Sequence, residues 1–435
     1  MSLTARILIS MGAGIFFGSV LNFVNIQGLL SEGLNLWLHQ YLVEGFFDGI
    51  GRIFIASLKL LVVPLVFVSL VCGISSLSAS TRMGPIAGKT LLFYMLTTAI
   101  AITLALIVAV LVQPGMGIEL AGSANYIAKQ APPLKDVLVN IFPSNPVRAM
   151  AEGKMLQIIV FSLLTGYAIS RAGQPGKRIA GFFKDFEQVI MKMVSVLMSL
   201  APYGVFCLLA KLFSELGVSA IADLGKYFMT VLFVLFLHAL LVYSFILKSV
   251  TGLNPAMLFY KMRSLWAFAF STASSGATLP ITLRTVEKRL GVNNSVAAFT
   301  VPLGATINMD GTAIMQGVAT AFIAQVYGVD LGLSGFLTVV LTATLASVGT
   351  AAVPGVGLVT LSMVLQQVGL PVEGIALIIG VDRLLDMVRT AVNITGDATV
   401  AMVIAQSEGQ LDESVYHDPL ADTLNMDAVT SEGKV

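Results

Sequence analysis

The segment DRLLDMVRTAVNITGD, residues 382–397, gathers three aspartates and two arginines in a chain that otherwise avoids charge. On an α-helix, which turns by about 100° per residue, six of its polar side chains fall within about 60° of one direction. These are Asp382, Asp386, Arg389, Thr390, Asn393 and Asp397. Such a face can bind a zwitterion that brings its own ammonium and carboxylate groups. The alternative is internal compensation, in which Asp382 pairs with Arg389, and Asp386 with Arg383 or Arg389, only to hold helices together.

A second polar segment, PLGATINMDGTA, covers residues 302–313. Asn308 and Asp310 are two residues apart, about 200° around an intact helix, so they face one site only if the helix unwinds there. Gly304 and Gly311 favour unwinding. Freed carbonyl oxygens, together with Asp, Asn, Thr and Ser oxygens, are hard ligands that suit an alkali cation. Zinc or copper is not indicated, because the histidines are scattered and both cysteines lie in apolar runs.

The composition places these polar segments in a membrane. Of 435 residues, 56% are hydrophobic and 11% charged, with a mean hydropathy of +0.89, whereas soluble domains are about 25% charged. Each ionised side chain at the bilayer centre costs about 2.5 to 3.5 kcal/mol, so a charged helix face must look inward and meet partners. The net charge of +1 and the lack of a Lys/Arg cluster argue against nucleic acid as a partner.

Six regular membrane-spanning helices are predicted from the long apolar runs, at residues 7–25, 45–77, 90–114, 156–172, 189–213 and 227–250. Lys and Arg favour cytoplasmic loops. The second, fourth and sixth connections carry two or three each, the first connection has none, and the third and fifth carry a few, among them Lys129 and Lys211. This bias predicts a cytoplasmic N-terminus.

Beyond residue 253 the apolar segments are interrupted at STASSGATLP, residues 271–280, and at ASVGTAAVPGVG, residues 346–357. Each interruption precedes a helix with Asn, Gly and Asp, namely NMDGT and NITGD, which indicates an internal repeat. Paired interrupted segments are the sequence sign of a transporter binding site. Two ordinary glycine-containing helix contacts are the alternative. The loop charges predict that the first hairpin enters from inside and the second from outside.

With these segments in this order, the chain resembles the sodium-coupled glutamate/aspartate and dicarboxylate transporters, a family that includes archaeal aspartate symporters and animal excitatory amino-acid transporters. The motifs ASSGATLP, PLGATINMDGT, ASVGTAAVPG and LDMVRTAVNITGD carry the resemblance, which extends from about residue 7 to 406. It implies an all-α polytopic membrane protein with eight transmembrane helices, two re-entrant helical hairpins, inverted repeats and an elevator-type mechanism. It also implies a homotrimer in the lipid bilayer.

The resemblance divides the chain into six parts. Residues 1–255 hold six membrane helices, 256–292 the first re-entrant hairpin, and 293–328 an unwound seventh helix. Residues 329–370 hold the second hairpin and 371–406 the eighth helix. The hairpin tips are expected at 274–277 and 350–355. Residues 407–435 are polar and acidic with little periodicity, which predicts a disordered cytoplasmic tail.

The resemblance also assigns substrate-binding residues for L-aspartate or L-glutamate. Arg389 meets the side-chain carboxylate, Asp386 receives the α-ammonium, and Asp382 orients Arg389. The rest of the amino acid is held at Ser274, Ser275, Thr312, Val353, Gly357, Thr390 and Asn393.

Sodium ions are the implied coupling ions, with no organic cofactor. One site maps onto Asp397, Asn393, Asn308 and the Gly304 carbonyl. A second maps onto Tyr94, Thr97, Thr98, Asn308 and Asp310. A third, near the second hairpin, maps onto carbonyls of Thr306, Ser347, Val348 and Thr350.

Four positions depart from the family pattern. Archaeal members place an arginine at the position of Ala273 and animal members place one at that of Met387; our hypothesis is that Arg383 compensates for both. Gln316 stands where proton-carrying animal members have a glutamate, which argues against proton cotransport, although some bacterial relatives are proton-driven. Ala352 replaces a common glycine of the second hairpin.

The leading interpretation is therefore sodium-coupled uptake of acidic amino acids across the plasma (inner) membrane, with both termini cytoplasmic and the second hairpin as the extracellular gate. Proton coupling and a C4-dicarboxylate or neutral amino-acid substrate are alternatives within transport. An ion channel would need a continuous pore lining, whereas these polar residues converge on one spot. An intramembrane hydrolase using Ser274 or Ser275 would need a nearby base, and only His238 lies in a span, so no enzyme activity is expected.

Overall fold

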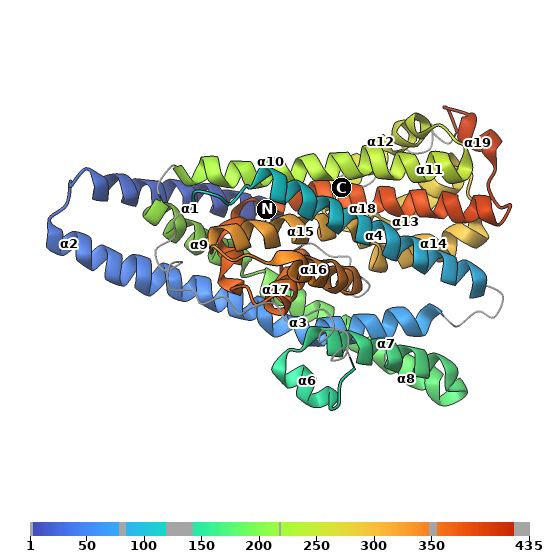
Figure 1. The fold of residues 1–435 in the computed structure, drawn as a ribbon, viewed down its shortest axis with the longest axis horizontal. Coiled ribbons are helices and arrows are strands. Elements are labelled where there is room, and N and C mark those ends of the chain that lie inside the picture. The colour runs from blue at the N-terminus through green and yellow to red at the C-terminus, as the bar shows by residue number, and fades with distance from the viewer. Residues whose placement is uncertain (1–2, 78–83, 119–141, 217–218, 348–354, 422–435) are drawn as a thin grey trace.

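The computed structural model describes residues 3–77, 84–118, 142–216, 219–347 and 355–421 (Figure 1). Within these residues the chain is helical apart from one antiparallel bridge between Val292 and Leu411. The elements of the first half are α1 Leu3–Ile26, α2 Glu32–Trp37, η1 Leu38–Phe47, α3 Asp48–Leu77, α4 Gly84–Val112, α6 Pro146–Glu152, α7 Met155–Arg171, α8 Gly173–Met198 and α9 Ala201–Leu216.

The second half begins with α10 Ser219–Leu237, η3 His238–Tyr243, α11 Ser244–Thr251, α12 Pro255–Thr272, α13 Ser275–Arg284, η4 Thr285–Arg289 and α14 Asn294–Ile307. It continues with α15 Asp310–Val326, α16 Gly332–Ser347, α17 Val356–Gln367, η5 Val372–Gly374, α18 Ile375–Ser407 and α19 Glu413–His417. Of these, η1, η3 and η4 are π-helices and η5 is a 3₁₀-helix.

Three helical stretches among the described residues are long and apolar enough to cross a membrane: Ile9–Ile26, Ile86–Val112 and Leu224–Thr251. They coincide with the first, third and sixth predicted spans. Large apolar side chains on them face outward, for example Leu111 at 78% and Phe245 at 73% exposure. Exposed apolar surface of this kind is expected where lipid is the solvent.

The predicted fifth span, residues 189–213, is wrong as a single helix. The chain turns at Ser199 and Leu200, between α8 and α9. Pro202 lies in the first turn of α9, where the missing proline N–H does no harm, whereas inside a continuous helix it would break a hydrogen bond. The two helices then diverge, since α8 packs on α3 and α7 while α9 packs on α1.

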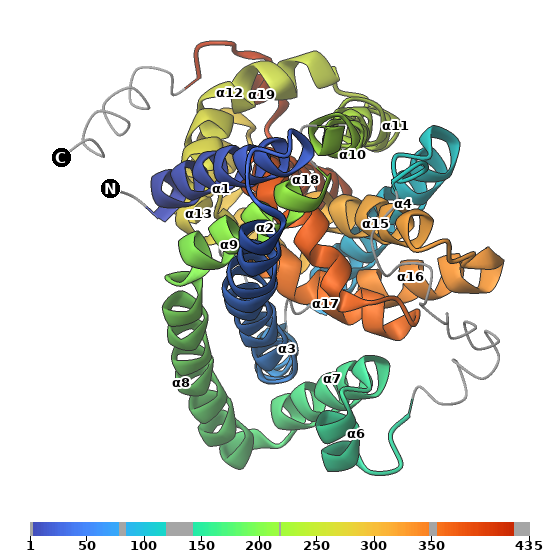
Figure 2. The ribbon, with the colours of Figure 1, turned by 90° about the vertical axis from the view of Figure 1, so that its left-hand side faces the viewer.

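Helix α18 lies in the middle of the bundle and is in contact with α10, α12, α14 and α15 (Figure 2). Helices α3, α7 and α8 lie to one side of this group (Figure 2). Most of α18 is buried, including both ends of its charged segment, Asp382 and Asp397. The charged face therefore looks inward, as the cost of exposing charge to lipid requires.

Two helix pairs flank the central helices. Helices α12 and α13 lie toward the end where α19 lies, and α16 and α17 are displaced toward the opposite end (Figure 1). The first pair turns at Ala273, which has a left-handed φ of +47°, and at Ser274, whose hydroxyl caps α13 by accepting from the Ala277 N–H at 3.2 Å. The turn thus comes earlier than the predicted tip at 274–277, because residues 275–277 already form the first turn of α13. The predicted second tip lies outside the described residues except for Gly355.

The seventh predicted helix is interrupted between Asn308 and Asp310, the place where unwinding was predicted if the two residues face one site. Helix α14 ends at Ile307 and α15 begins at Asp310. Asn308 is extended, with φ −91° and ψ 91°, and Met309 has φ −116° and ψ 47°. The break therefore allows Asn308 and Asp310 to face neighbouring sites.

The prediction of a disordered tail from residue 407 is wrong for the segment that the structure describes. Residues 410–417 pack against α12 and the end of the first hairpin. The Asn293 N–H donates to the Gln410 carbonyl at 2.9 Å, and the buried Tyr416 hydroxyl donates to the Asn254 carbonyl at 2.8 Å. The buried Lys261 ammonium donates to the carbonyls of Arg289 and Val415, each at 2.6 Å. This segment is held by hydrogen bonds to backbone groups and by the buried Tyr416 ring, so its order does not depend on a periodic apolar pattern in the sequence. Residues 422–435 lie outside the described residues.

Candidate functional site

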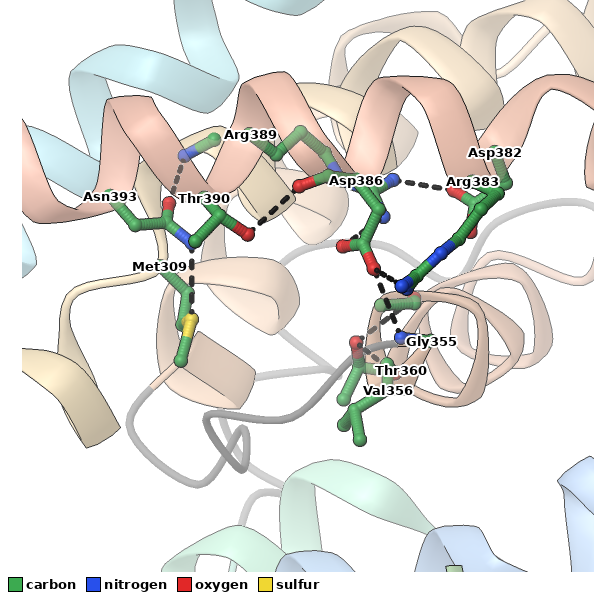
Figure 3. A network of polar contacts seen from close by, with 12 residues as sticks. Met309, Gly355, Val356, Thr360, Asp382, Arg383, Asp386, Arg389, Thr390 and Asn393 are labelled. Carbon is green, nitrogen blue, oxygen red and sulfur yellow. Dashed lines mark hydrogen bonds and ion pairs between the residues drawn. The ribbon is translucent and has the colours of Figure 1, made fainter. Parts of the chain in front are cut away.

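The four charged residues of the first half of α18 form one ion-pair network (Figure 3). The Arg389 guanidinium is fully buried and donates to Asp382 Oδ1 at 2.6 Å and to Asp386 Oδ1 at 2.8 Å. Arg383 Nη1 lies 3.4 Å from Asp386 Oδ2. Asp382, which is predicted to orient Arg389, is in direct contact with it. The pairs are also those that internal compensation predicted, so two guanidinium groups and two carboxylates balance one another here.

Asp386 links this network to the second helix pair. The Gly355 N–H donates to Asp386 Oδ2 at 3.1 Å, and Gly355 is the N-cap of α17 with φ +82° (Figure 3). A carboxylate at a helix N-terminus is favoured by the orphan N–H groups and the helix dipole. A glycine is needed at this cap because a side chain would strain the left-handed backbone. The carboxylate predicted to bind an ammonium group is thus also a contact of α17.

Gly357, in the first turn of α17, lies directly against Arg389. A Cβ added there would come within 3.3 Å of Arg389 Nη2 and 3.2 Å of the Thr312 methyl group. Thr312 is buried in the first turn of α15. Arg389, Gly357 and Thr312, which are separated in sequence, are therefore brought together by α18, α17 and α15.

Four other predicted substrate residues, Ser274, Ser275, Thr390 and Asn393, are buried. The Thr390 hydroxyl donates to the Asp386 carbonyl at 2.8 Å. Asn393 Oδ1 accepts from the Gly311 N–H at 2.7 Å, and its amide nitrogen lies 3.3 Å from the Met309 sulfur (Figure 3). Ser274 and Ser275 lie at the start of α13. Val353 lies outside the described residues.

The first predicted sodium set is brought together at the helix break. Asn308 donates through its amide to Asp397 Oδ1 at 2.9 Å and to the Asn393 carbonyl at 3.3 Å. Gly304 lies against Asp397 as well, because a Cβ added at Gly304 would collide with the Asp397 carboxylate and with the Tyr94 hydroxyl. A glycine therefore lets a backbone, a carboxylate and a phenol converge.

The second predicted sodium set lies beside it. The Thr98 hydroxyl donates to Asp310 Oδ1 at 2.6 Å, and Thr97 Oγ1 is 3.5 Å from Asn308 Oδ1. The Tyr94 hydroxyl donates to the Thr300 carbonyl at 2.9 Å. All five side chains are fully buried. Three residues of α4 thus meet residues of α14, α15 and the helix break.

Sequence reasoning missed two neighbours of Asp310. The Tyr243 hydroxyl donates to Asp310 Oδ2 at 2.8 Å, and His238 Nε2 lies 3.4 Å from the same oxygen. His238 was noted only because it is a histidine inside a predicted span, and nothing in the sequence distinguished Tyr243. For the third sodium set, the Thr306 hydroxyl donates to the Leu303 carbonyl and that of Ser347 to Thr344. Val348 and Thr350 lie outside the described residues.

Two buried carboxylates have no lysine or arginine partner in the described part of the chain. Among the residues that the structure describes, neither Asp310 nor Asp397 makes an ion pair with a lysine or arginine, although both are at most 1% exposed. Burying an ionised carboxylate without a counter-charge is strongly unfavourable. The oxygen-rich surroundings of both suit an alkali cation, and a proton would also neutralise them.

These features define a class of protein. A helical membrane protein whose buried charges meet at a broken helix, beside paired shorter helices, has the architecture of a secondary transporter. The chain belongs to the sodium:dicarboxylate symporter family, whose family model matches residues 3–407. The resemblance stated from the motifs is confirmed.

Named relatives cover nearly the whole chain. The chain is 34% identical over 389 residues to a proton/sodium-glutamate symport protein of Bacillus caldotenax, which covers 87% of this chain and 92% of that protein. It is 35% identical over 447 residues to an excitatory amino acid transporter of Caenorhabditis elegans, with 91% and 87% covered. The proton/glutamate-aspartate symporter of Escherichia coli is 34% identical over 423 residues, covering 94% of each. These relatives are transporters and not enzymes.

Proposed function

We propose that this protein is a secondary active symporter that takes up L-aspartate or L-glutamate together with sodium ions. The observation that carries the proposal is the separation of two kinds of buried charge. Arg389 and Arg383 balance Asp382 and Asp386, whereas neither Asp310 nor Asp397 pairs with a lysine or arginine in the described part of the chain, and the one basic neighbour of Asp310 is His238. The first group suits a zwitterion with an extra carboxylate, and the second suits cations.

Substrate binding would proceed by an exchange of partners. The ammonium group of the amino acid takes the place of the Arg389 guanidinium at Asp386, and Arg389 turns its freed donors to the side-chain carboxylate, a match that suits guanidinium geometry. Asp382, which holds Arg389 at 2.6 Å, keeps the guanidinium in place during the exchange. Each buried charge then trades one partner for another, so none is left unpaired. A C4-dicarboxylate has no ammonium group for Asp386.

Cation binding would neutralise the two unpaired carboxylates. Asp397, Asn393, Asn308 and the Gly304 carbonyl would hold one sodium ion, and Tyr94, Thr97, Thr98, Asn308 and Asp310 a second. Carbonyls of Thr306, Ser347, Val348 and Thr350 would hold a third. The hydrogen bonds from the Asn308 amide to Asp397 and to the Asn393 carbonyl support the first site, because they bring these groups together. The contacts of Thr98 with Asp310 and of Thr97 with Asn308 support the second.

The gate of the proposed transporter is the second hairpin, α16 and α17. The hydrogen bond from Gly355 to Asp386 supports this assignment, since a change of partner at Asp386, the residue proposed to receive the substrate ammonium, acts directly on the start of α17. Coupling follows if substrate and cations each favour the same closed hairpin. An elevator-type homotrimer in the inner membrane, with eight spans and cytoplasmic termini, completes the proposal.

Proton coupling is the second candidate. The relative from Escherichia coli is named a proton/glutamate-aspartate symporter. A proton on Asp310 or Asp397 would relieve the same buried charge as a sodium ion. Gln316 argues against a proton carried at position 316, because its amide donates to Thr360 at 2.7 Å and does not titrate.

The test is uptake of labelled aspartate and glutamate into proteoliposomes under a sodium gradient and a proton gradient imposed separately, with labelled succinate and alanine as comparison substrates. We expect acidic amino acids to accumulate under the sodium gradient alone. Accumulation under the proton gradient alone would favour the second candidate. Preferred uptake of succinate or alanine would refute the substrate assignment.

A further inference from the structure

The π-helix η3, His238–Tyr243, presents two side chains to one carboxylate oxygen. Tyr243 donates its hydroxyl to Asp310 Oδ2 at 2.8 Å, and His238 Nε2 lies 3.4 Å from that oxygen. Both residues and Asp310 are fully buried. The His238 and Tyr243 rings meet edge to face with centroids 4.7 Å apart. Residues five apart in the sequence are therefore neighbours in space.

This arrangement depends on the π-helical turn. In an α-helix, residues five apart point about 140° away from each other. A π-helix forms hydrogen bonds between residues five apart and so stacks them on one side. Helix α10 is α-helical up to Leu237, and α11 resumes at Ser244, so the wider turn is confined to the six residues that begin with His238 and end with Tyr243. Single π-helical turns of this kind occur frequently at functional sites.

The two oxygens of Asp310 have different surroundings. Oδ1 accepts from Thr98 at 2.6 Å, on the side where Thr97 and Asn308 meet, whereas Oδ2 faces η3. Nε2 is the ring nitrogen that faces Asp310, and it donates to the ionised carboxylate in the tautomer that carries the proton on Nε2. Two donors on Oδ2 fix the rotation of the carboxylate, and they leave Oδ1 turned toward the oxygens of α4 and the helix break.

We infer that His238 and Tyr243 are positioning residues of the cation site at Asp310, set there by the π-helical turn of η3. This inference rests on the proposed function, because it assigns a partner to one of its sodium sites. A carboxylate already held in its ligating orientation pays less ordering entropy when the cation binds. Gly396 supports the assignment, since a Cβ there would come within 2.5 Å of both the Tyr243 hydroxyl and the Asn308 amide.

The experiment measures two quantities in proteoliposomes: the sodium concentration for half-maximal aspartate uptake, and aspartate affinity at saturating sodium. Sodium-dependent thermal stabilisation of purified protein serves as a second readout. The variants are Tyr243→Phe, which removes one hydroxyl, and His238→Leu, which removes one donor. His238→Gln restores an N–H donor. Leu240→Ala and Leu241→Ala, at 52% and 61% exposure on the same helical turn, are the matched controls.

We expect Tyr243→Phe and His238→Leu each to raise the half-maximal sodium concentration about tenfold, the effect of one hydrogen bond to a charged group. Aspartate affinity at saturating sodium should change little, and His238→Gln should recover most of the sodium affinity. Sodium dependence equal to that of the two leucine controls overturns the inference. A loss of aspartate affinity as large as the loss of sodium affinity also overturns it, because that result would indicate general damage to the protein. A parent protein without any sodium response refutes the proposed sodium coupling itself, a result that is seen before any variant is compared.

Discussion

The Arg389 guanidinium and the Asp382 carboxylate are joined at 2.6 Å across two turns of α18, and neither side chain is more than 5% exposed. Because the pair is buried, its geometry is protected from water and from salt screening. The other guanidinium nitrogen, Arg389 Nη2, contacts Asp386, the residue that we propose exchanges Arg389 for the ammonium group of the substrate.

Asp382→Asn should weaken aspartate binding by tenfold or more. The amide keeps an oxygen near Arg389 but loses the charge that anchors the guanidinium, and charge-assisted hydrogen bonds are about twice as strong as neutral ones. The concentration of aspartate for half-maximal uptake is the measurement, with sodium saturating. Asp185→Asn on α8 is a control of the same chemistry. Equal affinities in the parent protein and Asp382→Asn would contradict the role of this pair.

Arg389→Cys should abolish uptake of acidic amino acids and admit small neutral ones. The substitution removes the guanidinium that meets the side-chain carboxylate and leaves space for an uncharged group. Competition by unlabelled serine, alanine and aspartate measures the change of specificity. Arg52→Cys, whose side chain is 73% exposed, should transport normally. Aspartate uptake that persists in Arg389→Cys would refute the assigned role.

Arg383→Ala tests whether this residue compensates for the missing arginines at Ala273 and Met387. Arg383 contacts the oxygen of Asp386 that also accepts from Gly355, so its loss should slow uptake and lower aspartate affinity several-fold. Initial rates over a range of aspartate concentrations separate the two effects. If neither the rate nor the affinity changes, the hypothesis of compensation fails.

Gly304→Ala should raise the sodium requirement about tenfold, because the new methyl group would push against Asp397 and Tyr94. Overpacking of a tight site costs about 1 to 3 kcal/mol. Gly88→Ala is the matched control, since an added Cβ there meets nothing within 4 Å. The measurement is aspartate uptake as a function of sodium concentration. Identical sodium dependence in Gly304→Ala and Gly88→Ala would show that Gly304 does not border a cation site.

Lys261→Met should release residues 410–417 from the first hairpin. The ammonium group satisfies two carbonyls, and a buried acceptor left without its donor costs about 1 to 3 kcal/mol. We expect a lower melting temperature in detergent and faster hydrogen exchange over residues 410–417. Lys248→Met, an exposed lysine at the end of α11, is the control. Unchanged exchange in Lys261→Met would show that the docking does not depend on this lysine.

Much of the site could be predicted from the sequence because helical periodicity is a local property. The spacing from Asp382 to Asp397 places its polar residues on one face whatever surrounds the helix. The two-residue step from Asn308 to Asp310 predicts a break if both side chains are to face one site. Composition alone requires that face to look inward, since lipid cannot solvate charge.

The partners of those residues were decided only by the tertiary structure. Asp310 meets Tyr243 and His238 across 67 and 72 residues, and nothing in the local sequence marks the π-helical turn that aligns them. The turn at Ala273, the separation of α8 from α9 and the docking of Tyr416 likewise depend on which surfaces meet. Periodicity determines which way a side chain points along its own helix, whereas the identity of the group that it touches depends on how distant helices pack.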